Sequence, residues 1–207
     1  MYPKKVKYTV EDTLFDPEHG VLKNKLGITD PITLQVIETQ NLLKAYEKSA
    51  EKYSEKHRFS DHDVCILHKW FLGDIYKWAG NYRAVDLSSE GIRYCHAAYI
   101  NNNMKSFGNM LSGRTPFSPH WTKDEIVKHL AEIHGELVIL HPFRDGNGRV
   151  TRLLCDLLLM QAEYNPMETN LFYSEEFVGK YHRAIQIFWT QADVSLLISI
   201  FDPLILR

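Results

Sequence analysis

The sequence lacks most features of a secreted, membrane-embedded or nucleic-acid-binding protein. It has three cysteines, an odd number without the spacing of metal ligands, which indicates reduced thiols rather than a disulfide framework. No apolar run approaches the roughly 18 residues of a membrane helix, and the polar, basic start of the chain has no signal-peptide core. A net charge of −2 implies no nonspecific affinity for nucleic acids or membranes. We therefore expect a cytoplasmic protein with no direct nucleic-acid partner and no membrane partner.

Repeats, low-complexity runs and long linkers are also absent. The chain has 207 residues, 44% of them hydrophobic and 24% charged, which is typical of one soluble globular domain. Apolar residues at helical spacing predict an all-α domain, and residues 1–30 are expected to form an irregular lead-in. The expected helices lie at about 31–55, 60–78, 98–112, 122–140, 148 onward, 174–189 and 193–202.

A single convincing β signal interrupts the helical pattern. Arg83–Leu87 and Ile92–His96 alternate roughly as short strands, and Ser88–Gly91 between them is typical of a turn. An isolated hairpin is marginally stable in water, so the expected hairpin at 83–97 must pack against the helices.

The most informative stretch is a polar loop between two apolar-striped helices, with the sequence His141-Pro-Phe-Arg-Asp-Gly-Asn-Gly-Arg-Val-Thr-Arg152. Pro142 ends the helix before the loop, directly after His141. The next helix begins near Gly148, where free N–H groups favour an anion. Gly146 and Gly148 allow positive φ and a close approach of the backbone to a ligand, and successive N–H groups there form a concave anion site.

Two arginines at the start of the second helix also indicate an anion-binding site. Arg149 and Arg152 share one face of the first turn, where cations oppose the helix dipole and acidic residues would stabilise better. A bound polyphosphate explains them, since their side chains would hold its oxygens. With His141 as a base and Asp145 as a metal ligand, the loop has the components of phosphate chemistry. The alternative, an ordinary turn with surface arginines, leaves the histidine and the arginine pair unexplained.

The loop resembles the signature of the Fic family, HPFx[D/E]GNGRxxR, and matches it at every defined position. Segments Asp16–Ile28 and Ile75–Arg83 also resemble the family, so the resemblance covers about residues 13–203. It implies one Fic domain over residues 1–207, a helical bundle with a β-hairpin flap. The segment Tyr94–Ile100 resembles small stand-alone bacterial Fic toxins.

The resemblance implies a protein adenylyltransferase, which moves AMP from ATP to a tyrosine, threonine or serine hydroxyl of a target protein. His141 would be the general base, a role that suits the near-neutral pKa of imidazole, and Asp145 would bind Mg²⁺. Phe143 would anchor the loop in the core, and Arg144 receives no role. The residues expected to hold the phosphates of ATP, with the arginines on the β- and γ-oxygens, are Gly146, Asn147, Gly148, Arg149 and Arg152.

The hairpin corresponds in this resemblance to the family's flap, which holds a target segment by strand addition. The residues that would bind the target are Ser88, Ser89, Glu90, Gly91, Ile92, Arg93 and Tyr94.

Regulation is expected to come from outside the chain. Many Fic proteins carry an inhibitory motif, [Ser/Thr]-x-x-x-Glu-[Gly/Asn], whose glutamate pairs with the second arginine, here Arg152. The only Glu-Gly pair of this sequence, Glu90-Gly91, has Asp86 in place of the serine or threonine. We therefore predict a small antitoxin that supplies the glutamate, or an unregulated enzyme. Related stand-alone toxins modify topoisomerases, which suggests a type II DNA topoisomerase subunit as the target.

Other functions stay open at this point. The donor could be UMP, phosphocholine or a terminal phosphate, although the phosphate-transferring branch departs from the GNGR sequence that is intact here. A nucleotide-binding interaction module without turnover is the alternative from another class, and the intact His141 and Asp145 argue against it. Residues interpreted as packing or surface residues rather than zinc ligands are His129, His134, Cys65 and His68, and the tryptophans expected to anchor the core are Trp70, Trp78, Trp121 and Trp189.

Overall fold

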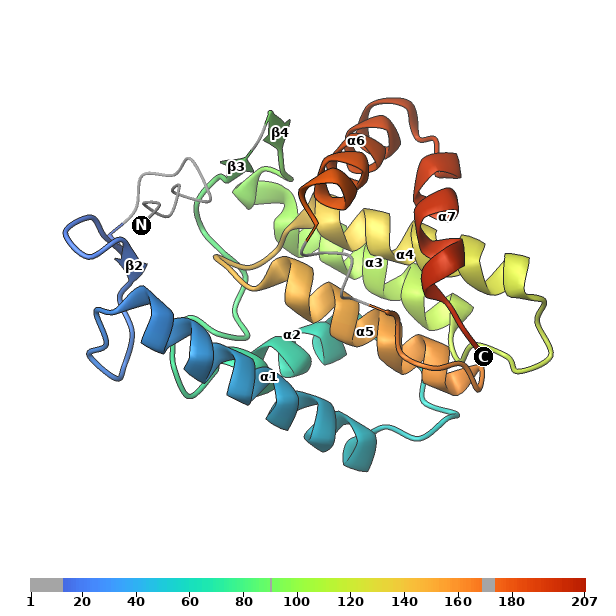
Figure 1. Cartoon of the computed structure of the whole chain (residues 1–207), viewed down its shortest axis with the longest axis horizontal. Helices are drawn as coiled ribbons and strands as arrows, with labels where there is room; N and C mark the ends of the chain where they lie inside the picture. The colour runs from blue at the N-terminus through green and yellow to red at the C-terminus, as the bar shows by residue number, and fades with distance from the viewer. Residues whose placement is uncertain (1–12, 90, 169–173) are drawn as a thin grey trace.

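Helices dominate the computed structural model, which describes residues 13–89, 91–168 and 174–207 (Figure 1). Most of the expected lead-in, residues 1–12, lies outside the described residues, as does Glu90. None of the helices in the described ranges combines the length and the apolar composition needed to cross a bilayer. The helices are α1 (Pro31–Lys52), α2 (Asp61–Leu72), α3 (Ile100–Arg114), α4 (Lys123–Leu140), α5 (Asn147–Gln161), α6 (Glu175–Gln191) and α7 (Ser195–Phe201).

Local capping residues explain where several helices begin. Asp30 accepts a hydrogen bond from the Thr33 backbone N–H at 2.7 Å, and Pro31 occupies the first turn of α1. Thr122 and Glu125 form a complete capping box on α4, in which each side chain bonds the other residue's backbone N–H. These starts confirm the expected ones, because a cap acts within one turn of its own chain.

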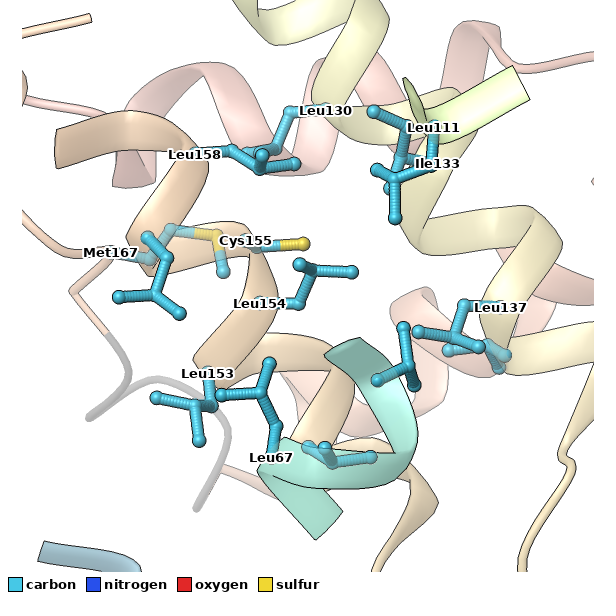
Figure 2. Close-up of a cluster of buried hydrophobic side chains, with 14 of the residues drawn as sticks. Leu67, Leu111, Leu130, Ile133, Leu137, Leu153, Leu154, Cys155, Leu158 and Met167 are labelled. Carbon is cyan, nitrogen blue, oxygen red and sulfur yellow. The ribbon is translucent and has the colours of Figure 1, made fainter. Parts of the chain in front are cut away.

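The core lies where α4 and α5 pack against each other, with α2, α3, α6 and α7 around them. Figure 2 shows leucines from α4 and α5 facing one another, and Leu67 of α2 packs beside them. Trp189, expected to anchor this core, is instead 44% exposed near the end of α6, because Ile185 and Phe188 fill the buried face of that helix.

Helix α2 is shorter than expected and ends at Leu72 instead of continuing to Trp78. Gly73 follows the helix, and the chain then passes through turns in which the N–H groups of Ile75 and Tyr76 both bond to the Leu72 carbonyl. Ile75 and Tyr76 stay buried all the same. Their apolar spacing therefore reflected burial in the core and not a continuing helix.

Both hairpins are short. The expected flap pairs β3 (Ser88–Ser89) with β4 (Ile92–Arg93), so the strands occupy the centre of 83–97 and the expected strand at 83–87 does not form. Its first residue, Arg83, instead bonds to the end of α4, as described below. Within the region expected to be irregular, β1 (Phe15–Asp16) pairs with β2 (Val21–Leu22).

At Gly135, α4 comes close to the C-terminal helices α6 and α7. A Cβ at this position would lie 2.6 Å from Cε1 of Phe188 and 3.1 Å from Cδ1 of Leu197. We expect Gly135→Ala to destabilise the protein by about 1–3 kcal/mol in urea unfolding, because overpacking outweighs the better helix propensity of alanine. Gly179→Ala on α6 is the control, since its Cβ would meet nothing within 4 Å, and it should be neutral or slightly stabilising. Equal effects of the two changes would contradict the packing explanation.

Candidate active site

The imidazole of His141 is held by the end of α4. Pro142 prevents the helix from continuing, and His141 turns the chain in the left-handed region at φ 45° and ψ 55°. Its Nδ1 lies 3.0 Å from the carbonyl oxygen of Val138 one turn earlier. A carbonyl only accepts hydrogen bonds, so this contact places the proton on Nδ1 and leaves the lone pair on Nε2. This is the tautomer that a histidine needs if its Nε2 is to accept a proton.

The ring of Tyr94 covers this histidine. The two rings stack with centroids 3.7 Å apart and planes at 17°, and the Tyr94 hydroxyl lies 2.6 Å from Oγ of Ser89 across the hairpin. The hairpin is therefore attached directly to the candidate base.

Arg83 ties the two ends of the hairpin to the end of α4. This arginine is 6% exposed, and its Nε donates to the carbonyl of His141 at 2.8 Å. Its terminal nitrogens donate to the carbonyls of Val85 and Cys95, each at 2.5 Å, and its backbone N–H donates to Pro142. The cation lies at a helix C-terminus, where the dipole favours it. The sequence does not indicate this role of Arg83, because its partners are backbone carbonyls of residues that lie elsewhere in the chain.

The flap residues differ in what they offer to a target. Gly91 and Arg93 are exposed, and Ser88 and Ser89 are half-buried on the strand that pairs with β4. Ile92 is only 3% exposed, so its side chain packs into the core and the group that it can offer to a target is its backbone. Residue 90, also expected to bind the target, lies outside the described residues.

The loop after His141 is held from within by Asn147. Its side-chain oxygen accepts the Phe143 N–H at 2.8 Å, and its side-chain nitrogen donates to the Phe143 carbonyl at 2.7 Å. Asn147 is 1% exposed, so its side chain shapes the loop, and the group that it can offer to a phosphate is its backbone N–H at the start of α5. Phe143 is fully buried and stacks on His68 at 3.7 Å, as expected of an anchor. Arg144, which received no role, is 5% exposed.

Glycine occurs at the two positions of the loop for different physical reasons. Gly146 has φ 81°, and a Cβ there would lie 2.8 Å from Cδ1 of Leu72 and 3.2 Å from Nε2 of His68. Gly148, expected to need positive φ as well, is an ordinary residue of α5, and its Cβ would meet only Arg152, at 3.5 Å. The backbone thus requires glycine at the first position, whereas the second leaves open space beside the arginine.

Arg149 takes part in a partly buried ion-pair network that we did not anticipate. Its Nη1 lies 2.5 Å from the Glu38 carboxylate and its Nη2 lies 3.7 Å from the Asp145 carboxylate. Glu38 also accepts the Tyr76 hydroxyl at 2.6 Å, and the guanidinium lies 4.7 Å from the ring centroid of Phe71. This network orients Arg149 next to the loop. The sequence did contain a signal, because Glu38 falls on the buried stripe of α1.

Arg152, one turn further along α5, faces a different set of groups. Burial, together with the charge of Arg152, lowers the pKa of His134 to about 3. The ring of His134 bonds to the Tyr181 hydroxyl through Nε2, at 2.8 Å. The two arginines expected to share the phosphates thus have different neighbours: Arg149 pairs with Glu38 of α1, whereas the charge of Arg152 acts on His134, Tyr181 and Tyr46.

Acid should destabilise this fold through two buried histidines. The backbone N–H of Gly80 donates to Nδ1 of His68, so Nε2 carries the proton that is donated to the Asp145 carbonyl. Burial lowers the pKa of His68 to about 4 and that of His134 to about 3, from 6.5. The unfolded chain therefore binds more protons below pH 6.5, and stability falls as the pH drops from 6.5 towards 4. We expect a loss of up to about 1.4 kcal/mol per pH unit per histidine, measured by urea unfolding at pH 7, 6 and 5. Unchanged stability across this range would contradict the two buried neutral rings.

Comparison with known proteins agrees with this geometry. The Fic/DOC family model matches residues 58–159. The chain is 33% identical over 155 residues to "Protein adenylyltransferase VbhT" of Bartonella schoenbuchensis, which covers 74% of this chain and 32% of that relative. It is 30% identical to "Probable protein adenylyltransferase Fic" of Salmonella typhimurium, with 74% of each chain covered. It is 28% identical to "Probable protein adenylyltransferase y4lH" of Sinorhizobium fredii, with 80% and 85% covered.

Solved structures show the same fold. The Bep8 FIC domain of Bartonella sp. 1-1C superposes with a TM-score of 0.76 at 20% identity, covering 92% of this chain and 93% of that chain. The BepC protein of Bartonella tribocorum, solved with bound AMPPNP, gives a TM-score of 0.73 at 18% identity and covers 93% of this chain and 95% of that one.

Proposed function

The chain belongs to the Fic/DOC family, and we propose that it is a protein adenylyltransferase that moves AMP from ATP to a hydroxyl side chain of a target protein. The observation that carries the proposal is the His141 ring, whose Nδ1 lies 3.0 Å from the Val138 carbonyl oxygen at the end of α4, directly before the loop that opens α5. Three relatives named as protein adenylyltransferases support the same reaction.

In the proposed reaction, Nε2 of His141 takes the proton of the target hydroxyl as its oxygen attacks the α-phosphorus of ATP. A new oxygen–phosphorus bond forms, the bond between the α-phosphorus and the bridging oxygen breaks, and pyrophosphate leaves. The backbone N–H groups of Gly146, Asn147 and Gly148, at the first turn of α5, are proposed to hold the phosphate oxygens. Arg149 and Arg152 add positive charge from the same helix.

Asp145 is the proposed ligand for Mg²⁺. Its side chain is 19% exposed and lies beside the opening turn of α5, and a carboxylate next to an anion site suits a hard divalent cation shared with phosphate oxygens. When bound, the ion would neutralise charge on the phosphates.

The hairpin is proposed to bind the target by strand addition, and a small antitoxin is proposed to supply a glutamate to Arg152. Exposed Gly91 and Arg93 support the first proposal, and the absence of the inhibitory motif from the sequence supports the second. A type II DNA topoisomerase subunit is the target class that we would examine first. If the product of a neighbouring gene leaves the activity unchanged, the antitoxin proposal is wrong.

The reaction is tested by incubating the purified protein with Mg²⁺, a bacterial lysate and ATP labelled at either the α- or the γ-phosphate. We expect protein bands labelled only from the α-phosphate, with masses that indicate the target. Label from the γ-phosphate alone would show phosphate transfer instead, and label from neither would overturn the proposal.

A further inference from the structure

A groove begins beside the candidate base and runs away from the nucleotide loop. A cavity of about 590 Å³ is lined by the segment Arg93–His96, which begins at the last residue of β4, and by side chains of α3, α4 and α6. A second cavity of about 420 Å³ shares Met110, Glu136, Ile139 and Trp189 with the first, so the two form one groove. Tyr94, which stacks on His141, is part of its wall. The groove therefore starts where the hydroxyl of a target would have to lie.

The walls of this groove combine apolar side chains with charged ones, among them Arg93 and Arg114, and two of its aromatic residues are open to solvent. Trp189 is 44% exposed and Tyr99 is 62% exposed. Phe107 and Met110 contribute further apolar surface from α3. Flat aromatic faces of this kind bind both aliphatic stems and cations.

A single carboxylate in the groove lacks a partner. Glu136 forms no hydrogen bond or ion pair with any residue in the described ranges, because nearby Arg114 is already bonded to Glu132 at 2.5 Å. Burial raises the pKa of the Glu136 carboxyl, and Arg114 opposes that shift. Glu136 is exposed, so the groove offers an accessible carboxylate beside Met110 and Trp189 as well as Arg114, and such a site suits a cation that arrives with apolar surface of its own.

We propose that this groove binds a lysine or arginine side chain of the target protein, near the hydroxyl residue that is modified. The stem of that side chain would lie on Met110 and Trp189, and its charge would meet Glu136. Because the groove begins at Arg93–His96, a target segment paired with the hairpin continues directly into it. The inference rests on the proposed function and adds a preference for basic residues beside the target residue whose hydroxyl receives AMP.

The test measures peptide binding separately from catalysis. Short peptides, each with one tyrosine and with arginine, glutamine or glutamate at successive neighbouring positions, are titrated onto the His141→Ala variant. We expect arginine peptides to bind about fivefold more tightly than their glutamine counterparts at one position. Adding Glu136→Gln should remove this preference, and adding Glu136→Lys should transfer it to the glutamate peptides. Adding Glu47→Gln, at an exposed site on α1, should leave it unchanged.

The same peptides are then incubated with the active protein and α-labelled ATP. A basic preference in binding without any labelling would overturn the proposed function and leave the groove inference standing. Labelling without a basic preference would overturn the groove inference and support the function. A preference that survives Glu136→Gln, or no peptide binding at all, would also show that the groove inference is wrong.

Discussion

Replacement of His141 by alanine should lower the rate of AMP transfer by about 10²–10⁴-fold and leave ATP binding intact. The imidazole provides the lone pair that accepts the hydroxyl proton, whereas the N–H groups at the start of α5 belong to the backbone and stay in place. The rate is measured by label transfer from α-labelled ATP, and nucleotide binding by calorimetry with a non-hydrolysable analogue.

His62→Ala is the control, because His62 is an exposed histidine in the first turn of α2. It should transfer AMP at the rate of the unchanged protein. If His141→Ala retains full transfer, another group is the base. If it loses transfer and nucleotide binding together, the residue acts through the shape of the loop and our assignment is wrong.

Replacement of Arg83 by methionine should have the second large effect, on both stability and catalysis. Methionine keeps an apolar stem but leaves the carbonyls of His141, Val85 and Cys95 without the guanidinium. Because buried acceptors without donors cost about 1–3 kcal/mol each, and effects above about 4–5 kcal/mol are exceptional, we expect a loss of about 3–5 kcal/mol in urea unfolding. The released hairpin and histidine backbone should also lower kcat by about 10²-fold, as small misplacements of catalytic groups do.

The Arg83→Lys variant tests whether Arg83 positions the hairpin and His141 for catalysis or only stabilises the fold. Lysine keeps the charge but lacks the planar fork, so it cannot reach both ends of the hairpin and the end of α4 at once. Below its unfolding temperature this variant should lose kcat while its affinity for ATP stays near that of the unchanged protein. Arg58→Met, at an exposed arginine before α2, should change neither quantity. Equal losses of kcat and ATP affinity in Arg83→Lys would contradict the proposed role.

Some features of this fold were predictable because their causes lie within a few residues of chain. The capping boxes at Ser60–Asp63 and Thr122–Glu125 begin α2 and α4 where expected. Pro142 ends α4 at His141, and Gly146 opens α5 with the positive φ that its position requires. The family signature was recognisable for the same reason, because it occupies one continuous loop. The resemblance that it carries implied the all-α fold with a hairpin.

Other features depend on partners that are distant in the sequence. The expected strand at 83–87 is absent because Arg83 bonds to the end of α4, some 58 positions later along the chain. Helix α2 ends early while Ile75 remains buried, because the core accepts its side chain from a turn. A hydrophobic pattern records that a residue is buried and does not record which backbone geometry buries it.

The sequence alone determined the all-α class, the helix starts, the loop and the chemistry of its residues. These features depend on local hydrogen bonds and on helical periodicity, and both involve residues that are close in the sequence. Only the tertiary structure decided how that chemistry is arranged. It showed Nδ1 of His141 bonded to Val138, Arg149 paired with Glu38 of α1, and the Asn147 side chain occupied by the loop itself. It also left Glu136 unpaired in a groove beside the hairpin. Each of these depends on which elements pack together, and packing joins residues that no local pattern connects.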